Sequence, residues 1–598
     1  MVFDDRAFTM AESTQTYTFP QPMCANNDQA GGGDGKISCA KAGSKACSKC
    51  LLVQYCSKDC QAAHWKFHKK DCQSPLMKKS WKPQWAVEKR MPTFITPGGD
   101  LSAPVHEWVT MVQHGSKKYL WGNVPAVDVI QSRKNEGETF PEEFNILFAA
   151  SGDIRNVVKS MIGLPVAYTG KCEIVINDRD FDIVARNAIL LLTALLFDPM
   201  EAADIMLHTW YSAFLPESML QKLQEKILPL IEDVCMKVRD RPEKSLQSKT
   251  WTFGTRKLSL TLPKDSWDLL PSFLKVPSGL TTSQAKKVMV ETTLAPSRRD
   301  YIDRAFYIKP PAWRVAAVKF RTDGILLPFG NSRKEFNAPN PTMFQSTDFW
   351  PMMDSADPEE GWAINEFMSK PPPSRNDVYG SIYFYVLKQL EEFCQRMSNL
   401  KARFQLFRID AMDLPSILDE RGIGENFFDR IEVSNIGDRG YLGPPKLLAT
   451  FGPYLKRKSQ NPHATLLALF LNAVHESYDA QDQIGSIKAE IVQLNKYMSL
   501  DVATLSRMDQ ETWDPEVIKY LNARSAFRDF DRPFDKFQKD CCFNEIGPIV
   551  GLKIKNKNTL VEKWPLRLKP GSTQEEFEML LASGHTGSER YVEWESLT

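Results

Sequence analysis

Five of the chain's twelve cysteines and two of its eight histidines fall within residues 47–72, CSKCLLVQYCSKDCQAAHWKFHKKDC. Their spacing is Cys47-x2-Cys50-x5-Cys56-x3-Cys60-x7-His68-x3-Cys72. The first pair has the spacing of a tight turn in which both thiolates reach one ion. The two x3 pairs each place both side chains on one face of a short helix. Such regular spacing favours a metal site over a chance accumulation of free or buried cysteines.

Two further cysteines upstream complete a set of eight candidate ligands. The set is Cys24, Cys39, Cys47, Cys50, Cys56, Cys60, His68 and Cys72. Eight such ligands are enough for two closed tetrahedral zinc sites. So short a segment buries too little apolar surface to fold alone, whereas structural zinc contributes roughly 10–16 kcal/mol in small zinc peptides. The sequence therefore predicts two structural zinc ions.

Outside this segment the composition is ordinary for a globular protein, with 42% hydrophobic and 25% charged residues and a net charge of +1. The opening MVFDDRAFTMAEST lacks the basic start and apolar run of a secretory signal. The apolar run 188–197, AILLLTALLF, is too short to span a bilayer and predicts a buried helix. We expect a cytoplasmic or nuclear protein with reduced thiols and no membrane association. The sequence carries no signal for an oligomeric state.

The cysteine-rich segment resembles a MYND zinc finger from Cys24 to Cys72. Besides the ligands, the resemblance rests on Tyr55-Cys56, Gln61 and the His64-Trp65 pair ahead of His68. It implies interleaved coordination, with one zinc held by Cys24, Cys39, Cys56 and Cys60 and the other by Cys47, Cys50, His68 and Cys72. Spacing alone leaves His64 open as a ligand, and the family pattern favours His68. The family's first two cysteines are closer together, but the glycine-rich insertion here costs little loop entropy.

MYND fingers are mainly docking modules for short, often proline-containing peptide segments, so the resemblance implies a protein partner. The finger is also basic. Its lysines are Lys41, Lys45, Lys49, Lys58, Lys66, Lys69 and Lys70. They raise nucleic acid as an alternative partner, but no aromatic residues are interleaved for base stacking. We therefore expect a peptide partner and no nucleic acid.

The body of the chain shows the alternation of a doubly wound α/β sheet. Its first half predicts strands at 145–150 and 172–178 and helices at 151–161 and 180–197, with Ser151 or Asp153 as a helix cap. Its second half predicts strands at 404–410 and 428–435 and helices at 413–420 and 464–477. Residues 200–310 read as mostly helical, with a few polar strands such as 256–262.

These patterns predict an α/β fold: a small two-zinc finger, then a Rossmann-like doubly wound sheet with a helical insertion. The predicted parts are a flexible N-terminus (1–23), the finger (24–72), a linker with aromatic anchors (73–104), the first half of the sheet domain (105–240), a helical or irregular insertion (241–325), the second half (326–480) and a mixed C-terminal extension (481–598).

The body resembles the N-terminal domain of dynein axonemal assembly factor 3 over residues 105–230, and more weakly over 326–344. The shared residues are Trp121, Gly122, Pro125, Ala126, Asp128, the SGDIRN turn at 151–156, Asn177-Asp178 and Trp210-Tyr211. The whole chain is similar to fungal proteins that pair this domain with a MYND finger. The assembly-factor family has a methyltransferase-like fold and acts in cytoplasmic preassembly of dynein arms, so the resemblance implies such a fold and an assembly-factor-like role. Axonemal work is not implied by the sequence itself.

Class I methyltransferases bind S-adenosylmethionine at the carboxyl ends of their strands. The resemblance maps this cofactor onto Gly152, Asp178 (or Asp180) and Asp410. The turn AASGDIRN holds one glycine where that family has two or three, and side chains at 153 and 154 crowd the space that a cofactor needs. Aspartates at strand ends also commonly cap the next helix.

The sequence therefore favours a non-enzymatic adaptor or assembly factor with a degenerate methyltransferase-like body and no catalytic residues. The alternative is an S-adenosylmethionine-dependent methyltransferase with a MYND targeting module. No P-loop, HExxH, GxSxG or SET-domain segment is present. We expect Asp300, Asp303 and Arg304 on a solvated helix face, Cys541-Cys542 as buried thiols, and segment 339–362 packed irregularly across the core.

Overall fold

The computed structural model describes residues 21–27, 39–95, 114–137, 140, 143–499 and 513–598. Most of the predicted N-terminal segment 1–23, the insertion between the first two cysteines and the start of the predicted domain 105–240 lie outside the described residues. No helix in these ranges is both long and apolar enough to cross a membrane.

A nine-stranded mixed sheet forms the centre of the described chain, in the order β12-β13-β11-β10-β3-β4-β9-β7-β6. The strands are β3 (Glu143–Phe148), β4 (Lys171–Asp178), β6 (Leu246–Phe253), β7 (Arg256–Pro263), β9 (Lys401–Arg408), β10 (Arg430–Glu432), β11 (Thr465–Phe470), β12 (Leu552–Ile554) and β13 (Arg590–Ser596). The six strands from β11 to β7 run parallel. The antiparallel strands β13, β12 and β6 extend the sheet at its two edges.

Side chains of the central strands alternate between two cores. Ile146 and Ile174 face a large core, whereas Leu147 and Val175 face a smaller one. Because parallel strands are covered on both faces, they read as continuous apolar runs in the sequence. The α/β character of the chain follows directly from this pattern.

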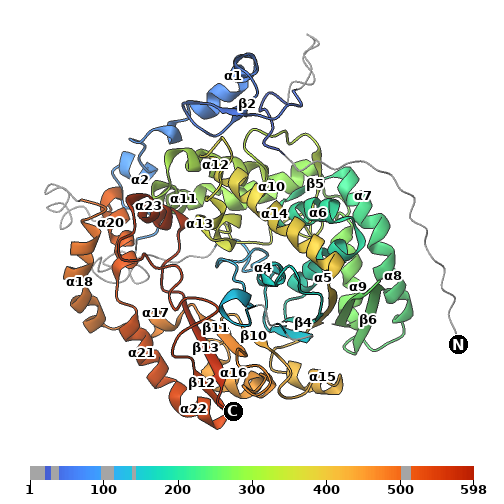
Figure 1. Cartoon of the computed structure of the whole chain (residues 1–598). Helices are drawn as coiled ribbons and strands as arrows, with labels where there is room; N and C mark the ends of the chain where they lie inside the picture. The colour runs from blue at the N-terminus through green and yellow to red at the C-terminus, as the bar shows by residue number, and fades with distance from the viewer. Residues whose placement is uncertain (1–20, 28–38, 96–113, 138–139, 141–142, 500–512) are drawn as a thin grey trace.

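Helices cover both faces of the sheet (Figure 1). The larger core gathers α4 (Arg155–Gly163), α5 (Phe181–Leu196), α6 (Pro199–Tyr211), α7 (Glu217–Lys226), α8 (Leu228–Lys237), α9 (Lys264–Leu269), α10 (Thr282–Thr293), α11 (Arg299–Tyr307), α12 (Pro311–Asp323), α13 (Ile364–Phe367) and α14 (Val378–Asn399). The smaller core gathers α15 (Leu414–Glu420), α16 (Gly443–Phe451), α17 (Ala473–Ser477), α21 (Asp531–Asp540) and α22 (Phe543–Ile549). Two peripheral cores include α2 (Gln84–Val87) with α20 (Pro515–Ala523), and α18 (Ala480–Leu494) with α23 (Gln574–Ser583). A separate short pair consists of β5 (Phe214–Pro216) and β8 (Phe336–Pro339).

The predicted helix at 464–477 is wrong over its first half. Residues 465–470 form strand β11, all six of them buried between β10 and β13, and the helix α17 begins only at Ala473. A short continuous apolar run does not distinguish a buried strand from a buried helix by its period. The sequence did predict correctly that this run is buried.

The structure also differs from the expected helical insertion at 241–325. This segment contributes the hairpin β6–β7 to the main sheet, where β7 pairs in parallel with β9. The C-terminal segment likewise contributes β12 and β13 to the opposite edge. Both segments are thus part of the central sheet, in addition to the helices they carry.

The linker after the finger is fixed to the body by buried contacts. Trp85 packs edge-to-face on Phe94, and its Nε1 donates to the Trp513 carbonyl at 2.9 Å. Arg90 makes a bidentate pair with Asp300 at 2.6 and 2.8 Å, and the Gln84 amide donates to Asp303 at 2.8 Å. The prediction of a solvated face for Asp300 and Asp303 is therefore wrong, because both carboxylates are buried against the linker.

Two other predictions concern packing. Segment 339–362 places Phe344, Trp350 and Trp362 in the larger core, as expected for irregular packing across it. Of the two adjacent cysteines, Cys541 is buried and Cys542 is exposed, so only the first matches the expectation.

Candidate functional sites: a cavity at the strand ends and two zinc tetrads

A cavity of about 800 Å³ opens at the carboxyl ends of the parallel strands. The ends of β3, β4, β9, β10 and β11 all contribute to it, together with segments 117–125 and 440–442. The strand order reverses at β3, where β4 lies on one side and β10 on the other. Crevices at such a switch point are the usual ligand sites of open α/β sheets. We refer to this space as the strand-end cavity.

The structure brings Gly152, Asp178 and Asp410 together on the wall of the strand-end cavity, although they are up to 258 positions apart (410 − 152) in the sequence. Gly152 has a φ of +59°, and a Cβ added there would meet no atom within 4 Å. The turn after β3 is therefore open toward the cavity at this residue. Asp410 is exposed, and its Oδ1 accepts from the Met412 amide at 3.0 Å.

Asp178 ties the first turn to the end of β4. Its two carboxylate oxygens accept from the amides of Gly152 at 3.0 Å and Asp180 at 2.9 Å. Burial raises the pKa of Asp178, although these two amides act in the opposite direction. Asp180 itself caps α5 by accepting from the Asp182 amide at 2.9 Å, which is the helix-cap role that aspartates at strand ends commonly take.

A buried ion pair fixes the rest of the turn. The Arg155 guanidinium donates to Asp153 at 2.6 Å and to the carbonyls of Val124 and Gly361, while the Gly122 amide donates to Asp153 at 3.0 Å. Trp121 adds a hydrogen bond from its Nε1 to the Trp210 carbonyl at 2.8 Å. The Trp-Gly entry, the SGDIRN turn and the Trp-Tyr pair, which are separate in sequence, thus form one packed unit beside the cavity.

Sequence reasoning missed three residues of the cavity. Glu432 ends β10 and is only 4% exposed, whereas Tyr119 and Tyr441 are 48% and 54% exposed and line the same cavity. The one signal for Glu432 was a carboxylate between the two apolar residues Ile431 and Val433 of a predicted strand. The two tyrosines lie in segments without periodicity, and no sequence signal marked them.

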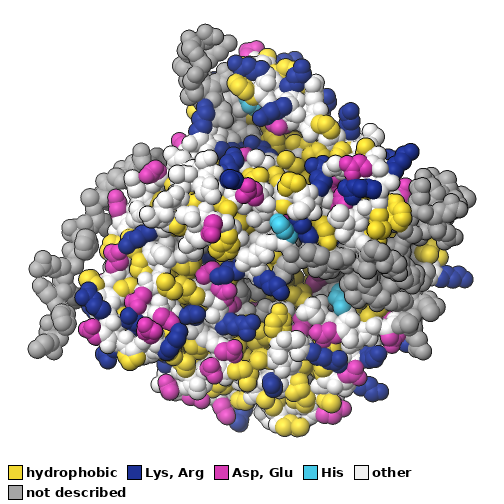
Figure 2. Space-filling view, turned by 180° about the vertical axis from the view of Figure 1, so that it is seen from behind, with side chains coloured by type: hydrophobic (Ala, Val, Ile, Leu, Met, Phe, Trp, Pro, Cys, Tyr) yellow, Lys and Arg dark blue, Asp and Glu magenta, His cyan; other side chains and the backbone are white. Residues whose placement is uncertain are grey.

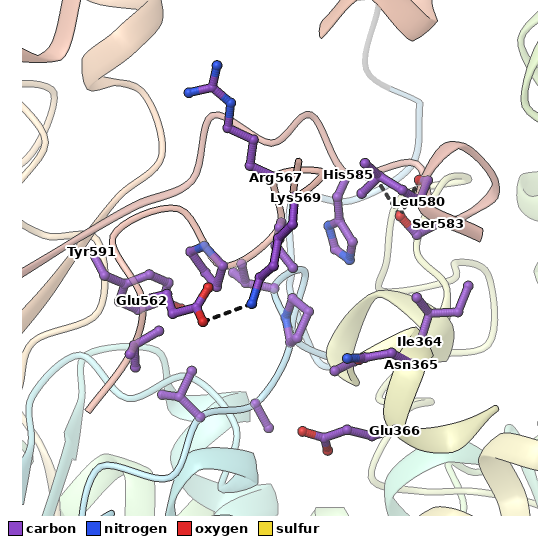
Figure 3. A pocket seen from close by; sticks show the side chains of 18 of the residues that line it. Ile364, Asn365, Glu366, Glu562, Arg567, Lys569, Leu580, Ser583, His585 and Tyr591 are labelled. Carbon is purple, nitrogen blue, oxygen red and sulfur yellow. Dashed lines mark hydrogen bonds and ion pairs between the residues drawn. The ribbon is translucent and has the colours of Figure 1, made fainter. Parts of the chain in front are cut away.

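A second cavity of about 410 Å³ adjoins the first. Val124, Pro125 and Tyr591 line both. Figure 3 shows Tyr591 and Glu562 on one side of this second cavity and Ile364, Asn365 and Glu366 on another. An ion pair between Lys569 and Glu562, 2.9 Å long, lies on its wall. The two cavities are therefore neighbours that share these three residues in their walls.

The eight predicted zinc ligands form two tetrads in the cysteine-rich segment. The first is Cys24, Cys39, Cys56 and Cys60, and the second is Cys47, Cys50, His68 and Cys72. Within each tetrad the ligand atoms all lie within 4.8 Å of one another. Pairs such as Cys39–Cys56 at 3.6 Å, Cys56–Cys60 at 3.5 Å and Cys47–Cys72 at 3.9 Å have the Sγ···Sγ spacing of a tetrahedron. A Zn–S length of about 2.3 Å gives edges of about 3.8 Å.

Local structure explains how each tetrad is assembled. The hairpin of β1 (Lys45–Ala46) and β2 (Gln54–Tyr55) carries the Cys47-Cys50 turn at its tip, and α1 (Lys58–Cys72) follows. Ser57 caps α1 by accepting from the Cys60 amide at 3.2 Å. Because the hairpin and the helix each contribute to both tetrads, the two sites interleave as the resemblance implied.

His68, rather than His64, completes the second tetrad. The His68 Nε2 lies 3.3 Å from the Cys50 Sγ, whereas the His64 Nδ1 is 3.0 Å from the Tyr55 hydroxyl. Burial lowers the pKa of His68 to about 4, so the imidazole is neutral and able to coordinate. Spacing alone left this choice open, and the structure decides it.

Cys24 reaches the first tetrad through backbone pairing rather than through the helix. Its amide donates to the Lys41 carbonyl at 2.9 Å, and the next amide, of Ala25, donates to the Gln54 carbonyl at 2.8 Å. Burial raises the pKa of the Cys24 thiol to about 12, so a metal cation is what would keep it ionised. The donor sets thus fit two structural Zn²⁺ ions.

Comparison with known families agrees with this geometry. The profile of the MYND finger family matches residues 37–72, and that of a family described as "Domain of unknown function (DUF4470)" matches residues 120–215. No curated protein and no solved structure gave a match. Residues 37–72 form a MYND finger. It is a zinc-binding protein-interaction module, and Cys24 joins its first tetrad from outside the matched range.

The MYND finger is packed against the body rather than separate from it, above α12 and α14 in Figure 1. Its residues Leu52, Val53 and Tyr55 belong to the larger core. A proline-rich stretch of the same chain, Pro371 to Pro373, leads into the contact. The Ser374 amide donates to Gln54 at 3.3 Å, and Asn376 donates to the carbonyls of Cys50 and Leu51, each at 3.0 Å.

Proposed function

We propose that the protein is an adaptor whose MYND finger binds an acidic segment of a partner protein through the outward face of α1. The observation that carries this proposal is the division of the finger into two sides. The hairpin side is occupied by the body, including Ser374 and Asn376. The helix side is therefore the one that a partner can reach.

The outward face of α1 has a definite chemistry. Phe67 is 49% exposed, and the ammonium of Lys66 lies 4.8 Å from the centre of its ring. Lys58, Lys69 and Lys70 are exposed on the same helix. Figure 2 shows dark-blue basic side chains spread over the finger at the top of the molecule. An exposed aromatic ring among lysines suits an acidic segment that carries one apolar residue.

A fluorescein-labelled acidic peptide with a single phenylalanine, titrated onto the full-length protein, tests the docking face. Replacing Lys66, Lys69 and Lys70 by glutamate should weaken binding by at least about tenfold, because each lost attraction and new repulsion contributes on the order of 0.5 kcal/mol or more. Increasing salt should weaken the wild-type complex.

The matched control replaces three exposed lysines outside the finger by glutamate, namely Lys89, Lys446 and Lys557. It should leave the affinity for the peptide within about twofold. Equal losses in both triple variants would contradict the assigned face. Tight binding of a single-stranded oligonucleotide, with no binding of the peptide, would instead support the nucleic-acid alternative.

A second candidate function rests on the strand-end cavity. Taken in chain order, β3, β4, β9, β10 and β11 stand in the order 3-2-1-4-5 of doubly wound nucleotide-binding sheets. Class I methyltransferases add an antiparallel strand beside the fifth, which is the place of β13. This order, with Gly152, Asp178 and Asp410 on one cavity wall, supports a methyltransferase-like body that binds S-adenosylmethionine.

The residues present fit such a ligand. A volume of about 800 Å³ lies within the range of small-molecule sites. Gly152 leaves the turn open, and Asp178 and Asp410 would accept hydrogen bonds from ribose hydroxyls and the adenine amine. The Asp178 oxygens already accept amide protons but keep lone pairs for a second donor. When bound, the cofactor would supply an electrophilic methyl group.

Calorimetric titration with S-adenosylhomocysteine tests the second candidate. We expect micromolar affinity that falls at least about tenfold in Asp410→Ala, because a charge-assisted hydrogen bond is worth about 1.5–3 kcal/mol. The control Asp413→Ala removes an equally exposed carboxylate three residues away and should change little. If no heat of binding is measured up to millimolar ligand, the second candidate function is refuted and only the adaptor proposal remains.

The adaptor proposal extends to the kind of partner. The resemblance of residues 105–230 to the assembly-factor domain suggests a client or a chaperone of a cytoplasmic assembly step. In that setting the finger recruits the acidic segment, and the body provides a second binding surface. This proposal keeps the domain divisions predicted from the sequence. It treats the finger and the sheet body as separate functional parts.

A further inference from the structure

Glu432 is a buried carboxylate on the wall of the strand-end cavity. Its Oε1 accepts from the Ser434 amide at 2.7 Å. Its Oε2 is buried and has no hydrogen-bond partner among the described residues. A buried polar atom without a partner costs on the order of 1–3 kcal/mol, so its retention calls for a ligand or another compensation.

The neighbouring cation does not neutralise Glu432 directly. The Arg155 guanidinium donates to Asp153 and to two backbone carbonyls instead. The Asn156 side chain, on the same helix as Arg155, is close enough to act on the Glu432 carboxyl as a hydrogen-bond donor, and the Tyr591 phenol on β13 also faces it. Burial raises the pKa of Glu432 to about 7, against the lowering effects of Ser434, Asn156 and Arg155. The carboxylate therefore ionises within the physiological range.

The mouth of the cavity carries two exposed aromatic rings on different segments. Tyr119 lies in segment 117–125, and Tyr441 follows β10. Both rings line the same cavity, and each is about half exposed. Burial raises the pKa of Tyr119, with smaller contributions from Tyr441 and Glu360. Partly exposed tyrosines at a cavity rim offer flat surfaces on which a planar molecule can stack.

The strand order divides the strand-end cavity into two halves. Asp178 ends β4 and Asp410 follows β9 on one side of β3, whereas Glu432 ends β10 and Tyr441 follows it on the other side. Tyr591, which lines this cavity, also lines the neighbouring cavity of Figure 3. The part of the cavity beside β10 thus has its own carboxylate and its own aromatic ring, on the opposite side of β3 from Asp178 and Asp410. We call this part the second compartment.

We propose that this second compartment binds a planar aromatic amine, which stacks on Tyr119 and Tyr441 and donates a hydrogen bond to the Oε2 of Glu432. The ligand class follows from the chemistry of the wall. An ionised carboxylate with one unused oxygen selects an ammonium or N–H donor and rejects a carboxylate. The inference deepens the second candidate function by assigning a second molecule to the same cavity. It does not require that the first be S-adenosylmethionine.

Tryptamine and indole-3-propionate are suitable probes, because they share a ring and differ in the charge of the side chain. Titrated onto the full-length protein at pH 8, tryptamine should bind at least tenfold more tightly. Glu432→Gln keeps the acceptor for the Ser434 amide and should weaken tryptamine binding at least tenfold. Tyr441→Ala should weaken it about fivefold through lost stacking. Glu425→Gln, at an exposed site, should have no effect.

The pH dependence provides an independent readout. The ammonium of tryptamine stays protonated from pH 6 to pH 8, while Glu432 passes from mostly neutral to mostly ionised. Tryptamine affinity should therefore rise over this interval, by up to about tenfold for one titrating group. The rise should disappear in Glu432→Gln. Equal binding of the two probes, or an unchanged pH profile in that variant, would overturn the proposal.

The outcome is separable from that of the cofactor test. Affinity for S-adenosylhomocysteine should change less than about twofold in Glu432→Gln, because the mapped cofactor residues lie on the other side of β3. If S-adenosylhomocysteine binds and tryptamine does not, the second compartment is refuted while the cofactor site stands. If only tryptamine binds, the cofactor site is refuted while the second compartment stands.

Discussion

Removal of the two zinc ions is expected to unfold the MYND finger while the central sheet remains folded. The finger has few apolar residues of its own, and its eight ligands hold the hairpin and α1 together. Structural zinc contributes roughly 10–16 kcal/mol in small zinc peptides, more than the total stability of most domains. No other contact on the finger approaches this magnitude, so this change has the largest expected effect.

Hydrogen exchange on the full-length protein, before and after chelation, measures the effect segment by segment. The amides of Cys24, Ala25 and Cys47, which donate to carbonyls within the finger, should lose their protection. Amides of β3 and β4 should keep theirs. Cys50→Ser should retain about one zinc per chain and lose protection in the finger, since closed sites need all four ligands.

Cys541→Ser serves as the matched control, because Cys541 is buried far from either tetrad. It should retain both metal ions and full protection in the finger. Persistent protection of the hairpin amides in a protein proven free of zinc would show that packing against the body, rather than the metal, holds the finger.

The ligand set of the finger could be predicted from sequence because coordination is recorded in local spacing. All eight ligands fall within 49 positions (24 to 72), and each pair carries its own geometric signature. The contact between the finger and the body could not be predicted in this way. Asn376 and Cys50 are 326 positions apart, and no local sequence pattern indicates that they are in contact.

The central sheet was predicted in part, for a related reason. Strands β3, β4 and β9 and the helix α5 follow from continuous apolar runs and an aspartate cap. The run that became β11 was misread because its six buried residues have no period. A strand at the place of β7 was predicted, but its position in the sheet was not. The pairings β7–β9 and β11–β13 join segments more than a hundred residues apart, and such pairings leave no local signal in the sequence.

Burial of charge was the least predictable property of the chain. Asp300 and Asp303 read as surface residues, because aspartates are mostly exposed. Each is buried through a partner on the linker, Arg90 for the first and the Gln84 amide for the second. Glu432 is the opposite case, a buried carboxylate with one oxygen left over. The difference between these cases depends on tertiary partners that only the structure reveals.

Gly122→Ala is expected to destabilise the body by about 3–5 kcal/mol, the second largest effect we predict. A Cβ at residue 122 would lie 1.4 Å from the Nη2 of Arg155, which is an impossible contact. The guanidinium is enclosed by Asp153 and by the carbonyls of Val124 and Gly361, so it has no alternative position that keeps its bonds. Displacing it leaves the buried Asp153 without its cation.

Denaturant unfolding of the full-length variant measures this loss, with Gly424→Ala as the matched control. A Cβ at residue 424 would meet no atom within 4 Å, and its backbone φ is not positive. The control should therefore change the free energy of unfolding by less than about 0.5 kcal/mol. The cost at Gly122 arises from space and not from backbone conformation, so Gly122→Ser should be as harmful as alanine. Equal midpoints for Gly122→Ala and Gly424→Ala would mean that Arg155 can leave Asp153 freely and that the turn beside the strand-end cavity does not depend on this ion pair.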